Sequence, residues 1–204
     1  MIKAECCLQT YTIFTLMYYL GAGKGEVRPL VWGDISFEEK TIALTHKLIK
    51  NMKTKKFEHV QGGKNVYRPR IVPITDAVVT LLQDWKEIQA IMLELQGLEQ
   101  TPEQFLFTYV NRQGEINLPI HPDWLNDRLK LVTAKYNLPN ITPHGLRHTF
   151  VSDLLNEGVS EWNIKSLVGH APNSNMINEV YGHMTERGQK ENIKAVHTLE
   201  DVRK

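Results

Sequence analysis

The chain has 204 residues, of which 42% are hydrophobic and 23% charged, and its formal net charge is +1. These values are ordinary for a globular protein, and the length suffices for one sizeable domain. The longest apolar run, residues 13–20, is too short to cross a bilayer and lacks the features of a secretory signal. Cys6 and Cys7 are neighbours and poorly placed to bridge each other, so no disulfide framework is expected. We therefore expect a soluble cytoplasmic protein.

Helices are predicted at two places near the start of the chain. Residues 8–20 are rich in apolar and aromatic side chains and predict a buried helix that Gly21 ends. Residues 26–33 place apolar side chains on one face of a second, short helix, which requires Pro29 to lie in its first turn.

Strands are predicted next. Residues 34–49 predict two strands joined by a tight acidic turn, and residues 66–74 predict a third, in which β-branched residues alternate with arginines. A loop containing the glycine pair at 62–63 separates the second strand from the third. We expect a small antiparallel sheet of three strands.

Positive charge is concentrated in residues 41–70, which carry eight basic residues and one acid, Glu58, for a net charge of +7. The rest of the chain is therefore at −6. Such segregation is expected where a polyanion faces the basic segment. Lysines that keep a solvated hairpin from aggregating would produce the same pattern, and charge alone does not separate the two explanations. The basic residues are Lys47, Lys50, Lys53, Lys55, Lys56, Lys64, Arg68 and Arg70.

The second half of the chain is helical. Thr75 or Asp76 begins a helix whose apolar positions follow the 3.6-residue period, namely Val78, Leu81, Leu82, Trp85, Ile88, Met92 and Leu95. Thr142 caps another helix, with Pro143 at its first position and Gly158 at its far end. Three further helices are predicted over residues 123–136, 162–168 and 175–184. With no internal repeat and no low-complexity linker, the chain is expected to form one α+β domain.

The glycine-rich stretch GAGKGEV, residues 21–27, suggests a phosphate-binding loop, but the pattern fails at both ends. Tyr18 occupies the position of the first glycine of a Walker A loop, and Gly25 stands where the magnesium-binding hydroxyl is required. A helix C-cap at Gly21 explains the stretch better. No nucleotide or other cofactor is therefore expected.

The segment HGLRH, residues 144–148, has three explanations. His144 and His148 have the spacing of zinc ligands, but the glutamate of the HExxH motif is missing and Arg147 would repel a dication, so we expect no metal. Each histidine taken singly could also cap a helix or fill space. The third explanation is phosphoryl transfer without a metal.

The residues that metal-free phosphoryl transfer requires are all present. A guanidinium such as Arg147 can neutralise the charge on the oxygens around phosphorus. Imidazoles such as His144 and His170 can donate to those oxygens or move the nucleophile's proton. The hydroxyl of Tyr181 can form a covalent phosphotyrosyl bond, and Lys64 can protonate the leaving sugar oxygen. Together with the basic segment, this chemistry points to a nucleic acid backbone.

Five boxes, in this order along the chain, resemble those of the tyrosine recombinase, or phage integrase, family. They are GAGKGEVRPLVWGDI (21–35), GGK…RIVPI (62–74), HGLRH (144–148), LVGH (167–170) and YGH (181–183). The resemblance implies a mainly helical α+β catalytic domain with a small antiparallel three-stranded sheet. It carries over Lys64, His144, Arg147, His170 and the nucleophile Tyr181 as catalytic residues. Glu26 would orient the site, and His148 would be structural or support it.

The resemblance also implies partners and a domain division. Double-stranded DNA would be cut and rejoined without metal or nucleotide, by a homotetramer in the intact parent, as part of DNA integration by a mobile element. Residues 1–188 would be the catalytic domain, truncated at its N-terminus and without a core-binding domain. Residues 189–204 would be a tail that docks on a neighbour. DNA contacts are expected from Lys47, Lys50, Lys53, Lys55, Lys56 and Arg68.

One position departs from the family pattern. The family's first catalytic arginine should stand at position 23, where this chain has Gly23. By analogy with an oxyanion-hole donor, its loss would cost ~10²–10³ in rate, or roughly 3–4 kcal/mol. On a helix Lys24 would point about 100° away from that position and Arg28 about 140°, so neither is expected to replace it. Two hypotheses remain open, an active recombinase and a catalytically impaired remnant that only binds DNA. A type IB topoisomerase, which shares the chemistry, fits the boxes less well.

Overall fold

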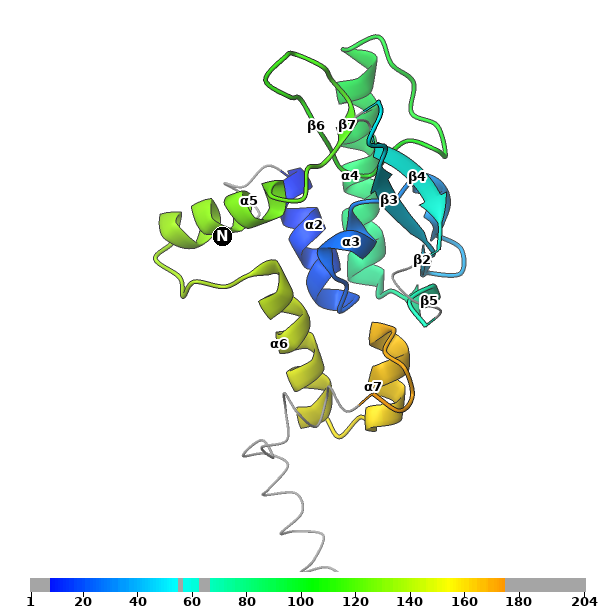
Figure 1. Cartoon of the computed structure of the whole chain (residues 1–204), viewed down its shortest axis with the longest axis vertical. Coiled ribbons are helices and arrows are strands. Elements are labelled where there is room, and N and C mark those ends of the chain that lie inside the picture. The colour runs from blue at the N-terminus through cyan, green and yellow to red at the C-terminus, as the bar shows by residue number, and fades with distance from the viewer. Residues whose placement is uncertain (1–7, 55–56, 63–66, 175–204) are drawn as a thin grey trace, which may run out of the picture.

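The computed structural model describes residues 8–54, 57–62 and 67–174, and its arrangement is shown in Figure 1. Six α-helices and a short 3₁₀ turn, η1 (Trp32–Asp34), lie in this part of the chain. The predicted α+β class is confirmed. The helices are α2 (Leu8–Tyr19), α3 (Lys24–Val27), α4 (Asp76–Glu94), α5 (Trp124–Lys135), α6 (Pro143–Asn156) and α7 (Glu161–Val168). No helix among these residues combines the length and apolar character needed to cross a membrane.

The predicted three-stranded antiparallel sheet is present. Its order is β1 (Ile35–Ser36), β2 (Thr41–Leu44) and β5 (Arg70–Pro73), and Ile42 of β2 lies opposite both Ile35 and Val72. The third strand is shorter than predicted, since only its last residues pair.

A hairpin occupies the region that the sequence predicted as a strand end and a basic loop. The second strand is interrupted at Thr45, after which β3 (His46–Lys50) pairs with β4 (Phe57–Gln61). No glycine or proline stands at or beside Thr45, so the break was not visible in the sequence. A third pair, β6 (Thr108–Tyr109) with β7 (Leu118–Pro119), closes another short hairpin.

The core forms where α2 packs against α4 and α6 (Figure 1). Ile13, Leu16 and Met17 of α2 are fully buried, as is Leu82 of α4. Part of the prediction for α4 was wrong, because Ile88, Met92 and Leu95 are exposed. Gln89 is buried instead and donates to the carbonyl oxygens of residues 105 and 106, while its own oxygen accepts from the indole of Trp32. An apolar side chain there would leave the buried indole N–H of Trp32 without its acceptor.

The predicted helix at 26–33 is also wrong in its bounds. Gly23 is the N-cap, so the helix α3 begins earlier and ends at Val27, before Pro29. With this start Pro29 would fall beyond the first turn, where its ring and missing N–H disrupt the helix. The predicted cap of α6 is confirmed, since the Thr142 hydroxyl accepts a hydrogen bond from Gly145 N at 3.0 Å and Pro143 opens the helix.

The end of α7 lies directly against the segment that leads into β5. Gly169 caps the helix in the left-handed conformation, with φ 66°. A Cβ atom at Gly169 would lie 2.9 Å from Arg70 Nη1, 3.0 Å from Tyr67 O and 3.2 Å from Arg68 Cα. Only glycine allows this approach, because any side chain would meet backbone as well as a guanidinium. The predicted helix over residues 175–184 lies outside the described residues.

Replacement of Gly169 by alanine should destabilise the protein more than the same change at Gly158. Both glycines have positive φ, but a Cβ at Gly158 meets nothing within 4 Å. Gly158→Ala should therefore cost about 1 kcal/mol through backbone strain alone. Gly169→Ala should cost a further 1–3 kcal/mol, roughly, through crowding. Urea unfolding of the two variants measures the difference, and equal losses would contradict the close approach.

Candidate active site

Four groups donate hydrogen bonds to the carboxylate of Glu26, which lies in α3. Its Oε1 accepts a hydrogen bond from Arg70 Nη1. Its Oε2 accepts from Arg68 Nη1 and from Arg147 Nη1, both at 3.2 Å, and from the backbone N–H of Gly23 at 2.8 Å. One carboxylate thereby joins α3, α6 and the segment around the start of β5, which carries Arg68 and Arg70.

Arg147 is held from several sides. It lies in the second turn of α6 and is 4% exposed. Its Nη1 also donates to Gly21 O at 2.9 Å, and its Nη2 donates to Val168 O. The same Nη2 lies 2.9 Å from His170 Nε2. Because a guanidinium can only donate, His170 Nε2 is the acceptor, which leaves the imidazole proton on Nδ1.

The charge of Glu26 is preserved despite burial. Burial by itself raises the pKa of this carboxyl group. Attraction to Arg70, hydrogen bonds from Arg70 and from the Gly23 N–H, and attraction to Arg147 outweigh burial and hold the pKa below its usual value. The carboxylate is therefore ionised at neutral pH.

The two histidines of the site are neutral at that pH. Burial, together with Arg147 and Arg68, lowers the pKa of His170 to about 4, against the opposing attraction of Glu26. Burial, then repulsion by His148, Arg147 and Arg68, also lowers the pKa of His144. The rings of His144 and His148 are in edge contact, with centroids 4.3 Å apart.

Arg70 was not among the site residues predicted from the sequence, yet it is buried in the cluster. Its Nε donates to Leu167 O at 2.6 Å, so that it connects the end of α7 to Glu26. The signal was present, since Arg70 opens the RIVPI part of one of the five boxes. It was counted only as part of the basic segment, because a sequence does not show which arginines turn inward.

Gly23 leaves room beside the carboxylate. A Cβ atom there would meet only Glu26 Oε2, at 3.4 Å. Neither candidate replacement has a described hydrogen bond to Glu26, although Arg28 lines the same cavity as Gly23. Arg28 is buried and its Nε donates to Ile120 O at 2.7 Å, while Lys24 Nζ donates to Asn126 Oδ1 at 3.4 Å.

The cluster carries an excess of positive charge. Among the described residues it contains three guanidiniums, one carboxylate and a neutral imidazole, which makes its net charge +2. Three buried nitrogen atoms, Arg68 Nε, Arg70 Nη2 and His170 Nδ1, have no hydrogen-bond partner in the described part of the chain. Donors without partners in a cluster of net positive charge suit an anionic ligand with several oxygens.

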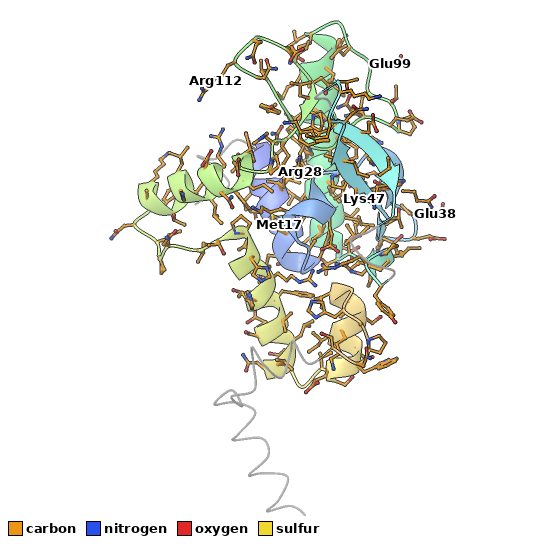
Figure 2. All side chains as sticks on the ribbon, in the orientation of Figure 1. Met17, Arg28, Glu38, Lys47, Glu99 and Arg112 are labelled. Carbon is orange, nitrogen blue, oxygen red and sulfur yellow. The ribbon has the colours of Figure 1, made fainter. Side chains whose placement is uncertain are left out.

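The basic segment is only partly described. Lys47 lies on β3 and is half-buried (Figure 2), and the exposed Lys50 and Lys53 lie at the far end of the hairpin. Four predicted site residues lie outside the described residues, namely Lys55, Lys56, Lys64 and the proposed nucleophile Tyr181.

One other group of side chains could hold a cation. Asp34, His46 and His59 offer ligand atoms that all lie within 4.8 Å of one another. Asp34 already accepts hydrogen bonds from His46 Nδ1 and from Val31 N, both at 3.0 Å. These bonds account for its burial without a metal. No member of this group contacts Glu26 or Arg147 through a described hydrogen bond.

The depressed pKa of His170 predicts a loss of stability in mild acid. Between pH 6.5 and about 4 the unfolded chain binds a proton at His170 that the folded chain does not bind. The free energy of unfolding should therefore fall as the pH drops through this window. In His170→Gln, which keeps an acceptor for Arg147, the fall should be shallower in urea unfolding from pH 7.5 to 4.5. An unchanged pH dependence would show that His170 is not held neutral by the fold.

Comparison with known proteins identifies relatives. Residues 3–187 match the Phage integrase family. A XerC-like tyrosine recombinase of Caldanaerobacter subterraneus is 28% identical over 202 residues, covering 93% of this chain and 49% of the relative. The ICEBs1 integrase of Bacillus subtilis is 27% identical over 180 residues, covering 88% of this chain and 46% of the relative. The chain thus spans about half the length of these curated relatives.

Solved structures have the same fold. The Tn1549 transposon integrase in complex with circular intermediate DNA superposes with a TM-score of 0.66 at 20% identity, over 91% of this chain and 59% of that one. The XerA recombinase superposes with a TM-score of 0.63 at 20% identity, over 95% and 57%. With a family match that covers nearly its whole length, the chain belongs to the phage integrase family of tyrosine recombinases.

Proposed function

We propose that this chain is the catalytic domain of a site-specific DNA recombinase that cuts and rejoins strands through a 3′-phosphotyrosyl intermediate on Tyr181. The observation that carries the proposal is the cluster around Glu26, in which Arg147 and His170 are positioned with a net charge of +2. Relatives named as integrases and recombinases support it, as does the fold shared with an integrase bound to DNA.

The cleavage step follows from the chemistry of these side chains. The Tyr181 oxygen attacks phosphorus, a P–O(Tyr) bond forms, and the bond from phosphorus to the 5′-oxygen breaks. The tyrosine proton passes to a neutral imidazole, for which His144 is suited because its pKa is lowered. Lys64 delivers a proton to the departing 5′-oxygen. Attack by another 5′-hydroxyl reverses the sequence and rejoins the strand, so no metal or nucleotide supplies energy.

The net positive charge of the cluster stabilises the transition state. As the tyrosine oxygen adds to phosphorus, the non-bridging oxygens gain a second negative charge. Fixed guanidiniums that already face each other across a carboxylate need little reorganisation to stabilise that charge. His170 adds an N–H at Nδ1, since its Nε2 accepts from Arg147.

A second candidate function is DNA binding with impaired catalysis. Gly23 favours it, because the resemblance places an arginine at that position, and the described hydrogen bonds of Lys24 and Arg28 go to Asn126 and Ile120 O and not to Glu26. The two candidates differ in one product, the covalent protein–DNA adduct.

For either candidate we propose double-stranded DNA as the partner and the cytoplasm as the compartment. We propose that residues 1–188 form the catalytic domain, that residues 189–204 dock on a neighbouring protomer, and that the protein assembles as a homotetramer on DNA. Dynamic light scattering of the protein with and without DNA measures the oligomeric state.

The full chain should form a covalent adduct with a suicide duplex, and Tyr181→Phe should not. A pool of duplexes with randomised flanks and a 5′-bridging phosphorothiolate is suitable, because the departing thiol rejoins poorly and the adduct accumulates. Denaturing electrophoresis of 5′-labelled strands detects the adduct, and mass spectrometry of the digest locates it.

Equal DNA affinity of the wild type and Tyr181→Phe is the control for folding. Binding without adduct in the wild type would contradict the recombinase and support the impaired remnant.

DNA affinity should fall steeply with salt, mainly through the basic segment, because lysine–phosphate contacts release counterions. Replacing Lys50, Lys53, Lys55 and Lys56 by glutamine should make the slope of log K against log salt less negative by about 0.9 for each phosphate that a lysine no longer neutralises. The matched control replaces the same four lysines by arginine, which keeps the charge and should keep the slope. If the glutamine variant retains the wild-type slope in fluorescence anisotropy titrations, the segment does not bind DNA.

A further inference from the structure

Arg68 differs from the other two arginines of the cluster in how its guanidinium is held. Arg70 and Arg147 each donate to a backbone carbonyl near the end of α7, Leu167 O and Val168 O respectively. Among the described residues the Arg68 guanidinium donates to Glu26 alone, at 3.2 Å, and its buried Nε has no partner there. A guanidinium carries five N–H donors, so Arg68 keeps most of its donors for a ligand.

Arg68 and Arg147 donate to the same acceptor atom. The Nη1 atoms of both arginines lie 3.2 Å from the same oxygen, Glu26 Oε2, and they come from different parts of the chain. We propose that Arg68 and Arg147 form a two-arginine clamp for the phosphate that is cleaved, and that Arg68 supplies the cation that Gly23 cannot. The identification of the anion as a DNA phosphate rests on the proposed function.

Open space beside Gly23 supports the clamp. A cavity of about 300 Å³ is lined by Gly23, Glu26 and Arg68, together with Arg28 and residues of β2 and β3. Of its two arginines, only Arg68 has a described hydrogen bond to Glu26. The side chain of Arg68 is 21% exposed, so its guanidinium is shielded but can be reached from solvent. A long side chain at position 23 would start in this same space, since a Cβ there meets only the Glu26 carboxylate.

Arg68 stands at a bend immediately before β5. Pro69 disfavours a helical backbone at the preceding residue, and the chain bends at Arg68 before the strand begins at Arg70. From these two positions both side chains reach Glu26.

Electrostatics are consistent with an oxyanion between the two arginines. Arg68 contributes to the lowered pKa of both His144 and His170, which places its charge near the two imidazoles. Without Arg68 the cluster would carry +1, and with it +2, which balances the two negative charges of a pentacoordinate phosphorus. Arg70 already donates to Leu167 O and Glu26 and keeps only its Nη2 without a partner, whereas Arg68 donates to Glu26 alone among the described residues, so Arg68 has more donors for the second position.

The clamp is tested first by binding of inorganic phosphate to the full chain, which requires neither DNA nor Tyr181. Titration followed by the ¹⁵N–Hε signals of the arginines should shift the Arg68 signal. Arg68→Ala should weaken phosphate binding about 10- to 100-fold, because a hydrogen bond to a charged group is removed. Arg68→Lys should be intermediate, since lysine lacks the planar fork. The control Arg112→Ala should bind like the wild type, because Arg112 lies exposed on the β6–β7 hairpin (Figure 2).

The second test is rescue in the adduct assay. Arg68→Ala should slow adduct formation by about 10²–10³. Gly23→Arg combined with Arg68→Ala should restore most of the rate, because a guanidinium returns to the same cavity. If Arg68 only braced Glu26, Gly23→Arg would change the wild type and Arg68→Ala by the same factor. Urea unfolding of each variant separates a loss of fold from a loss of function.

The outcomes distinguish this inference from the proposed function. Phosphate binding that is equal in the wild type and in folded Arg68→Ala would overturn the clamp, whatever the adduct assay shows. Phosphate binding that depends on Arg68, in a wild type that forms no adduct, would support the clamp and overturn the recombinase proposal. Adduct formation that Arg68→Ala leaves unchanged would also overturn the clamp.

Discussion

The site depends on one buried carboxylate that receives hydrogen bonds from three arginines. Glu26 joins Arg68, Arg70 and Arg147, which lie 42 to 121 residues away along the chain. Each partner needs the others, because three guanidiniums without the carboxylate would repel one another and a buried carboxylate without them would lose its charge. The carboxylate therefore holds α3, β5 and α6 in a fixed relation, and Arg70 and Arg147 extend that relation to the end of α7. The arrangement of the helices and the electrostatics of the site have the same origin.

The end of α7 contributes to the site through its backbone as much as through side chains. Its last carbonyl groups orient Arg70 and Arg147, and Gly169 lets the chain turn away in a left-handed conformation immediately afterwards. His170 then follows at the distance at which its Nε2 accepts from Arg147. A neutral imidazole beside a permanently charged guanidinium is a consequence of this geometry, and it explains why the positive charge of the cluster stays with the arginines. The absence of a side chain at Gly23 leaves the cavity that Arg68 borders.

Local signals predicted much of the fold, and their failures have identifiable causes. The start of α6 was predicted to the residue, since a threonine cap and a proline at the first position act through bonds within one turn. The bounds of α3 were wrong because its start depends on Gly23, whose N–H is held by Glu26. The hairpin of β3 and β4 was missed because the break at Thr45 is a change of pairing partner, from β5 to β4, and no glycine or proline marks it in the sequence. Gln89 was passed over in α4 because its partners, the indole of Trp32 and two backbone carbonyls, lie elsewhere in the chain.

The sequence by itself determined which chemical groups are available, where most helices begin and end, and the family to which the chain belongs. These depend on residue types and on spacings of a few positions, which a sequence displays directly. Only the tertiary structure decided that Arg68 and Arg70 turn to Glu26 while Arg28 binds Ile120 O, although all three are arginines in or near predicted site motifs. The physical reason is that a charged side chain takes the partner that packing brings within reach, and that partner is set by distant segments. Which arginines surround the carboxylate, and with what net charge, is a property of the folded chain.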